Sequence, residues 1–103
     1  MRRIHIPLSF AVIISVAQIP ALANQDLAKA KNCLGCHALE RKVVGPAYKD
    51  VAARYASDQN AAQQLAIKIR QGGGGVWGVL KMPSNPQVSE AEALQLARWV
   101  LSQ

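Results

Sequence analysis

Cys33-Leu34-Gly35-Cys36-His37 is the most informative stretch of this 103-residue chain. It has the form C-x-x-C-H, in which two thiols three positions apart are followed directly by an imidazole. This spacing is the signature of covalent haem attachment. Two thioether bonds can then reach the two vinyl groups on one side of a porphyrin, while the adjacent histidine falls under the iron. Cys33 and Cys36 are therefore predicted to bind haem c, with His37 as an axial ligand.

Other uses of this cysteine pair are less well supported. A disulfide between Cys33 and Cys36 would close too short a loop to stabilise the fold much. A thioredoxin-like redox pair needs a βαβ context, whereas helical periodicity dominates this chain. A zinc site needs four ligands, typically Cys and His, and beyond residue 23 the chain offers only Cys33, Cys36 and His37.

The first 23 residues have the order of a secretory signal peptide. Arg2 and Arg3 give a basic start, residues 8–17 form an apolar run, and Ala21-Leu22-Ala23 is an A-x-A cleavage site. The apolar run is shorter than the roughly 20 residues needed to span a bilayer, so an uncleaved anchor is the weaker interpretation. We expect cleavage after Ala23 and a working domain of residues 24–103 in the periplasm, since c-type haem is attached outside the cytoplasm.

The second axial ligand follows from a count. The chain has two methionines and two histidines, and Met1 and His5 belong to the predicted signal peptide. Met82 is then the remaining thioether, and His37 the remaining imidazole. We expect His/Met ligation, although a lone methionine is more often core filler and Lys81 is a rival ligand at high pH. Such an iron has a raised reduction potential and no open position, which favours electron transfer over catalysis.

Size and charge set further limits. The part after the signal peptide is one small domain. Small folds have a limited hydrophobic core and usually need further stabilisation, for example from a cofactor. The formal net charge of +6 falls to about +4 without Arg2 and Arg3, which is far from that of a nucleic-acid binder. As a group, the basic residues of the mature chain could steer docking to acidic partners. They include Lys29, Lys31, Arg41, Lys42, Lys49 and Lys81.

Apolar residues at helical spacing predict an all-α fold of about four helices, without repeats or a second domain. The predicted faces are Leu27, Ala30 and Leu34; Tyr48, Val51, Ala52 and Tyr55; Ala62, Leu65, Ala66 and Ile69; and Leu94, Ala97 and Leu101. Gly72-Gly73-Gly74-Gly75 ends the third helix, and a proline-containing loop follows. The S-x-x-E motif at 89–92 is a capping box that begins the last helix.

The set of motifs resembles the small class I bacterial cytochromes c, most closely the c-551 (c8) type, over nearly all of residues 24–103. The resemblance implies the cytochrome c fold around one covalently attached haem. Its landmarks, in order, are Cys33-Leu34-Gly35-Cys36-His37, Val44-Gly45-Pro46-Ala47-Tyr48-Lys49-Asp50-Val51-Ala52, Gly75-Val76-Trp77-Gly78, Met82-Pro83-Ser84-Asn85 and Leu96-Ala97-Arg98-Trp99-Val100-Leu101-Ser102-Gln103.

The resemblance also implies roles for individual side chains around the haem. The Pro46 carbonyl would accept a hydrogen bond from the His37 ring; a plain turn proline is the alternative. Trp77 would donate its indole N–H to a haem propionate, with core packing as the alternative. Asn85 would hydrogen-bond near the Met82 sulfur, and the alternative is an asparagine that caps the loop.

Two departures from the family pattern concern basic residues. Lys68 stands where the family tends to have an arginine near a propionate, and a lysine is a point charge rather than a two-pronged donor. Arg70 is a candidate substitute for that arginine. Lys81 replaces a proline that the family often has before the methionine, which puts a cation at the edge of the haem.

By resemblance, the protein is a monomeric periplasmic electron carrier without catalytic residues. It would pass electrons from a cytochrome bc complex to a dissimilatory nitrite reductase or a terminal oxidase, in respiration or denitrification. A dedicated subunit of a larger redox complex is the second hypothesis. An enzyme or gas sensor with a vacant sixth iron site is the third, and Met82 argues against it.

Overall fold

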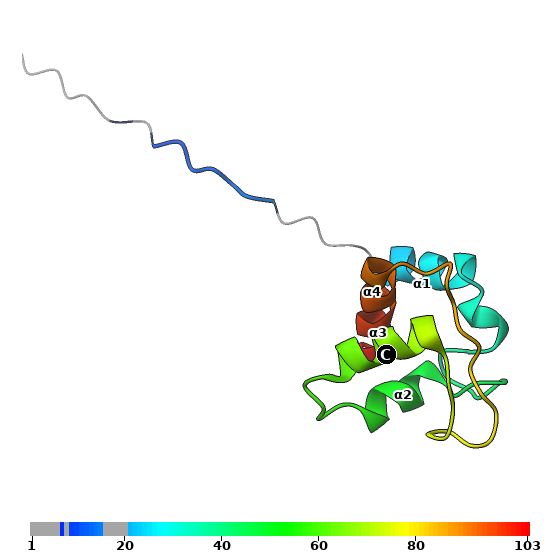
Figure 1. Cartoon of the computed structure of the whole chain (residues 1–103). Helices are drawn as coiled ribbons and strands as arrows, with labels where there is room; N and C mark the ends of the chain where they lie inside the picture. The colour runs from blue at the N-terminus through cyan, green and yellow to red at the C-terminus, as the bar shows by residue number, and fades with distance from the viewer. Residues whose placement is uncertain (1–6, 8, 16–20) are drawn as a thin grey trace, which may run out of the picture.

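The structure, a computed structural model, describes residues 7, 9–15 and 21–103. The last of these stretches forms helices α1 (Ala21–Ala30), α2 (Tyr48–Arg54), α3 (Ala61–Gln71) and α4 (Glu90–Leu101), with a short 3-10 helix η1 (Cys33–Gly35) after α1 (Figure 1). Within these described stretches there is no β-strand, only isolated bridges between His37 and Lys42 and between Gly73 and Met82. The predicted all-α class and the long loop before α4 are confirmed.

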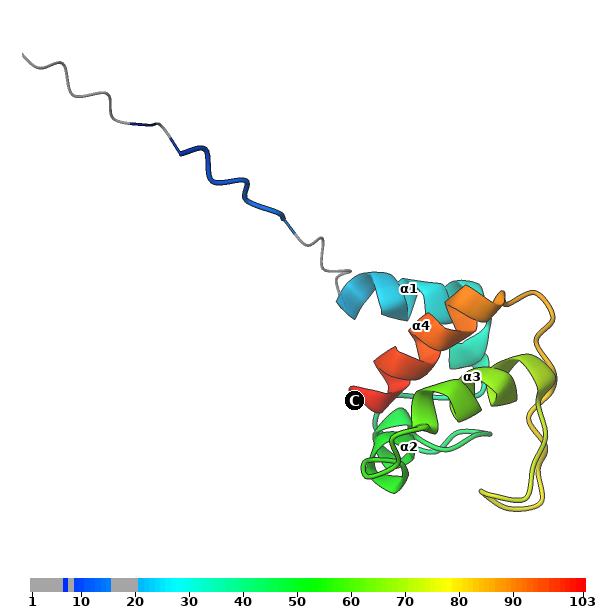
Figure 2. The same ribbon diagram turned by 60° about the vertical axis from the view of Figure 1, so that its left-hand side comes forward.

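About half of the predicted signal peptide, residues 1–23, lies outside the described residues. Residues 9–15 form neither helix nor strand, and they run away from the helical body in both ribbon views (Figures 1 and 2). Their large apolar side chains are 82–88% exposed, namely Phe10, Val12, Ile13 and Ile14. No helix of the described part has the length and apolar character needed to cross a membrane.

The C-terminal helix α4 is the centre of the fold, because α1, α2 and α3 all pack against it (Figure 2). The face predicted for it was only partly right: Ala97 is buried, whereas Leu94 and Leu101 are half-buried. Val88, just before the helix, is also fully buried. The buried residues of α4 are Ala93, Leu96, Ala97, Trp99 and Val100. Tyr48 and Val51 from α2 join the same cluster, so this helix carries much of the core.

The capping box predicted at the start of α4 is present. The Ser89 hydroxyl accepts a hydrogen bond from the Glu92 backbone N–H at 3.1 Å, and the Ser89 N–H donates to the Glu92 carboxylate at 3.0 Å. Two N–H groups that have no partner inside the helix are thereby satisfied. This fixes the point at which the loop from the Gly-rich segment turns into α4.

The start of the domain differs from the prediction in one respect. We expected Leu27, Ala30 and Leu34 to share one helix face, but α1 ends at Ala30. Asn32 then adopts a left-handed backbone conformation, with φ 65°, which asparagine tolerates better than most residues. The break turns the chain and lets η1 begin at Cys33 in a new direction.

Candidate functional site

A cavity of about 630 Å³ lies within the helical body. Its volume is in the range of small-molecule and cofactor sites, about 300–1,000 Å³. Residues of η1, α2, α3, α4 and the three loops that connect these elements line it, and most of the large side chains on its walls are apolar. These include Val44, Val51, Leu65, Ile69, Leu96 and Val100. The faces predicted for α2 and α3 thus contribute Val51, Leu65 and Ile69 to the walls, whereas Leu96 and Val100 of α4 lie outside the face predicted for that helix.

Cys33 and Cys36 both line this cavity as free thiols, which excludes the disulfide alternative in this structure. Backbone hydrogen bonds from the N–H groups of Cys36 and His37 to the Cys33 carbonyl, at 3.2 and 3.0 Å, hold the three residues in one tight turn. Burial raises the pKa of the Cys33 thiol above its ordinary value. The described residues contain no cluster of three or more metal-ligating side chains, so a zinc cage finds no support.

His37 lines the same cavity, and its ring is held on two sides. Nδ1 lies 2.8 Å from the carbonyl oxygen of Pro46. A carbonyl oxygen only accepts, so Nδ1 carries the proton and Nε2 keeps its lone pair. The ring also stacks on Tyr48, with centroids 4.9 Å apart and planes 18° apart. This is the contact between His37 and Pro46 that the resemblance implies, and it prepares Nε2 to bind a metal.

Met82 also lines the cavity, from the loop between α3 and α4. Its backbone is fixed by a two-way bridge to Gly73: the Met82 N–H donates to the Gly73 carbonyl at 2.8 Å, and the reverse bond measures 2.9 Å. The bridge ties the segment before Pro83 to the end of α3. The two predicted ligands and the two cysteines are thus brought together around one space.

Trp77 and Lys68 line the cavity as well, while Arg70 does not. The Trp77 ring is 39% exposed, and the Arg54 guanidinium lies 5.1 Å from its centroid in a cation–π contact. Arg70 instead donates from Nε to the Val88 carbonyl, at 3.1 Å. Arg70 is therefore not a substitute for a propionate-binding arginine, because its side chain points to the start of α4.

Asn85 does not line the cavity, and the structure gives it the loop-capping role that was the alternative interpretation. Its side-chain amide donates to the carbonyls of Ile69 and Pro83, at 2.9 and 3.3 Å. The amide oxygen accepts from Gln87 Nε2 at 3.0 Å. Both amide hydrogens are used in this way, so the expected hydrogen bond near the Met82 sulfur is absent.

The sequence analysis did not predict that Gly45 and Tyr48 both contact the His37 ring. A Cβ atom at position 45 would overlap the His37 ring. Tyr48 stacks on that ring and meets Trp99 edge to face, with centroids 5.5 Å apart. Burial raises the pKa of its hydroxyl. The signal lay in the Val44-Gly45-Pro46-Ala47-Tyr48 motif, where a small residue precedes the proline that contacts His37.

Residues 14–103 match the family model for cytochrome c. The chain belongs to the cytochrome c family. It is 55% identical to cytochrome c-552 of Nitrosomonas europaea over 82 residues, which cover 80% of each chain. It is 53% identical to cytochrome c-551 of Azotobacter vinelandii over 77% of this chain and 95% of that protein. The predicted relationship to the small c-551-type cytochromes is confirmed.

A solved structure supports the same conclusion about the fold. The crystal structure of wild-type cytochrome c552 from Nitrosomonas europaea superposes with a TM-score of 0.74 and 55% identity. The match covers 76% of this chain and 96% of that one. The cytochrome c fold predicted from the sequence is therefore confirmed.

The residues of this cytochrome fit one covalently bound haem c. The cavity is large and its walls are mostly apolar, with two free thiols and an imidazole at its edge. The haem supplies one-electron chemistry at its iron. The protein is a small electron-transfer haem protein rather than an enzyme, as the sequence predicted.

Proposed function

We propose that this cytochrome is a periplasmic one-electron carrier whose haem iron is bound by His37 and Met82. The observation that carries the proposal is that Cys33, Cys36, His37 and Met82 line one cavity, although Met82 lies far from the others in the sequence. The His37 imidazole and the Met82 thioether would be the two protein ligands that hold the haem iron. A neutral, soft sulfur also favours ferrous iron, which raises the reduction potential.

Side chains and a main-chain carbonyl around the cavity favour this ligation. The Pro46 carbonyl holds the His37 ring in the tautomer that leaves Nε2 free. The apolar walls surround the haem with few polar groups that would have to reorient when the charge on the iron changes. Trp77 and Lys68 are the cavity residues that we assign to the propionates, as an indole donor and a cation.

The export and partner assignments belong to the same proposal. We infer that residues 1–23 are removed as a signal peptide, and the exposed apolar side chains of residues 10–14 are consistent with a segment outside the folded domain. The cytochrome then works as a monomer. It accepts electrons from a cytochrome bc complex and delivers them to a dissimilatory nitrite reductase or a terminal oxidase. These partners rest on the resemblance.

The surface beside the cavity suits brief docking. Val79 and Leu80, at the mouth of the cavity, are 95% and 66% exposed. The cations Lys42 and Lys81 line the same cavity. An apolar centre with basic residues beside it fits a partner with an acidic rim, because charge guides the encounter and apolar contact fixes the pose.

The ligation is tested on the haem-loaded protein. The ferric protein should be low-spin near neutral pH and show the weak far-red band of sulfur-to-iron charge transfer. Met82→Ala should abolish the band, lower the reduction potential and allow carbon monoxide to bind the ferrous protein. Val79→Ala, which removes an exposed side chain of the same loop, is the matched control and should retain the band.

A wild-type protein that binds carbon monoxide readily and lacks the band would have a five-coordinate iron. The carrier proposal would then give way to a sensor or an enzyme. The partners are tested separately, by comparing the rates at which the reduced protein is oxidised by a nitrite reductase and by a terminal oxidase.

A further inference from the structure

We propose that Lys31 and Arg70 are positioning residues that hold Met82 at the iron through the loop that follows it. We call these two side chains, together with the carbonyls of Gln87 and Val88 that they bind, the basic clasp. The inference rests on the proposed ligation by Met82. It assigns a function to two cations outside the haem cavity, one on the turn after α1 and one on α3.

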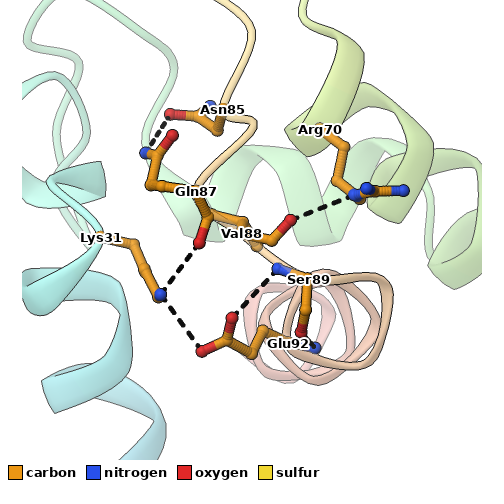
Figure 3. Close-up of polar contacts among 7 residues, drawn as sticks. All are labelled: Lys31, Arg70, Asn85, Gln87, Val88, Ser89 and Glu92. Atoms are coloured by element: carbon orange, nitrogen blue, oxygen red, sulfur yellow. Dashed lines mark hydrogen bonds and ion pairs between the residues drawn. The ribbon is translucent and has the colours of Figure 1, made fainter.

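In the clasp, the side chains of Lys31 and Arg70 bind two consecutive main-chain carbonyls just before α4 (Figure 3). Lys31 Nζ donates to the Gln87 carbonyl at 3.0 Å, and Arg70 Nε donates to the Val88 carbonyl at 3.1 Å. The two cations approach from different elements. The short segment before the capping box is thereby tied to both the turn after α1 and α3.

Each cation also meets an acid of the first turn of α4. Lys31 pairs with Glu92 at 3.3 Å, and Arg70 pairs with Glu90 at 3.3 Å. The Glu90 side chain is 89% exposed, and exposed ion pairs contribute little. Hydrogen bonds from a charged donor to a main-chain carbonyl are stronger, so the carbonyl contact is expected to dominate for Arg70. The Lys31–Glu92 pair is more enclosed, with side chains 23% and 31% exposed, and it acts together with the carbonyl contact of Lys31.

The segment bound by the clasp, at Gln87 and Val88, is the continuation of the loop that carries Met82. The Asn85 N–H donates to the Arg70 carbonyl at 3.0 Å, and the Asn85 side chain binds the Ile69 carbonyl. Met82 itself is bridged to Gly73. The stretch from 82 to 88 is therefore fixed to the end of α3 at its start, near its middle and at its end. Movement of Met82 away from the cavity would strain these contacts, and releasing the clasp should make that movement easier.

Imidazole is the probe for this movement, since it binds ferric iron only when the methionine sulfur leaves. In Arg70→Gln the affinity of the haem-loaded ferric protein for imidazole should rise about tenfold, equivalent to ~1.4 kcal/mol. The far-red band should also disappear at a lower temperature, well before the helices unfold. Lys31→Gln should act in the same direction, and the double variant should exceed either single one.

Three variants distinguish the effect of the carbonyl hydrogen bond from those of the ion pair and of the net charge. Arg70→Lys keeps the charge but lacks the planar Nε donor, so it should resemble Arg70→Gln. Glu90→Gln removes only the exposed ion pair and should bind imidazole like wild type. Arg98→Gln removes a cation from an exposed position on α4 and is the control for net charge.

If Arg70→Gln and Lys31→Gln lower the unfolding midpoint but bind imidazole as Arg98→Gln does, the two cations stabilise the fold alone and the inference is wrong. If Glu90→Gln has the full effect, the ion pair and not the carbonyl contact is responsible, and the clasp as described is overturned. A far-red band missing from the unaltered protein would instead overturn ligation by Met82. Should Arg70→Gln fail to fold, Arg70→Lys and Lys31→Gln provide the same test.

Discussion

Gly45 lies against the imidazole of His37, so closely that a Cβ atom at position 45 would come within 2.8 Å of Nδ1 and 2.9 Å of Nε2. Both the ring and the backbone are held in place by contacts. The ring is held by Pro46 and Tyr48, and the Gly45 N–H donates to the Cys36 carbonyl at 2.8 Å. The absence of a side chain at position 45 is thus required by the position of the His37 ring.

Gly45→Ala should therefore displace the His37 ring. We expect less covalent haem per polypeptide and a free energy of unfolding lower by about 1–3 kcal/mol, the usual range for overpacking. Haem absorbance per protein mass and urea unfolding measure the two effects. Gly35→Ala is the control, because no protein atom lies within 4 Å of a Cβ built there. Equal haem content and stability in the two variants would show that Gly45 is not constrained by His37.

Gly72 is predicted to be the most sensitive position of the four-glycine run. Its backbone has φ 71° and ψ −162°, a region open essentially to glycine alone, where another residue costs about 1–3 kcal/mol. A Cβ there would also lie 2.7 Å from the Ser84 nitrogen. Gly72→Ala should destabilise the protein by at least this amount and weaken the far-red band, because the Met82 loop must shift.

Gly74→Ala is the matched comparison for Gly72→Ala. The backbone at Gly74 does not have a positive φ, and the nearest atom to its Cβ is Lys81 Cγ at 3.0 Å, which can move aside. We expect a small loss of stability and an unchanged band. If both alanine variants lose the band alike, the flexibility of the whole run matters more than the conformation of one residue.

The fold, and the side chains that meet around the cavity, were predictable because each has a local signal. C-x-x-C-H marks the cysteines and His37, the apolar spacing marks the helices, and S-x-x-E marks the start of α4. Met82 followed from a count of methionines, because it is the one that lies outside the predicted signal peptide. These signals lie within a few residues of each other or in the composition, so they can be found without knowledge of the packing.

The polar contacts outside the haem cavity were not predictable, because they depend on which elements face each other. Arg70 and Asn85 had several partners of suitable chemistry, and only the packing of α3 against α4 directs both to main-chain carbonyls. Likewise, Lys31 was grouped with the free surface lysines. The break at Asn32 and the meeting of α1 with α4 bring it to Gln87.

The engagement of Lys31 changes the charge prediction for partner docking. Lys42 and Lys81 line the cavity and Lys49 is exposed on α2, so these three lysines should guide an acidic partner. Their combined replacement by glutamate should slow oxidation at low salt by about tenfold or more, within the range known for electrostatic steering. Stopped-flow oxidation by a nitrite reductase at increasing ionic strength measures the effect.

Lys29→Glu is the control for these replacements, since Lys29 is exposed on α1 and does not line the cavity. It should change the rate much less per charge. For wild type, the rate should fall as salt rises, because salt screens the attraction. A rate that responds neither to salt nor to the triple replacement would leave these lysines as ordinary surface residues.

Ionisation of Glu92 should make the fold more stable at neutral pH than at acid pH. The Ser89 backbone N–H and Lys31 both interact with its carboxylate, and they lower its pKa below the ordinary value of 4.5. The helix N-terminus also favours a negative charge. A carboxyl group whose pKa is lower in the folded state stabilises the fold fully above its unfolded pKa. That contribution is lost as the pH falls through the lower, folded value.

Glu92→Gln should therefore lower the urea midpoint near pH 7, and the difference from wild type should shrink toward zero as the pH falls to about 3, below the pKa of an ordinary carboxyl group. Glutamine can still accept the hydrogen bond from the Ser89 N–H, so the variant isolates the charge. Glu40→Gln, at an exposed position, corrects for the general effect of removing an acid. A difference between Glu92→Gln and wild type that stays constant from about pH 7 to about pH 3 would mean that packing at the capping box, and not ionisation of Glu92, stabilises the junction.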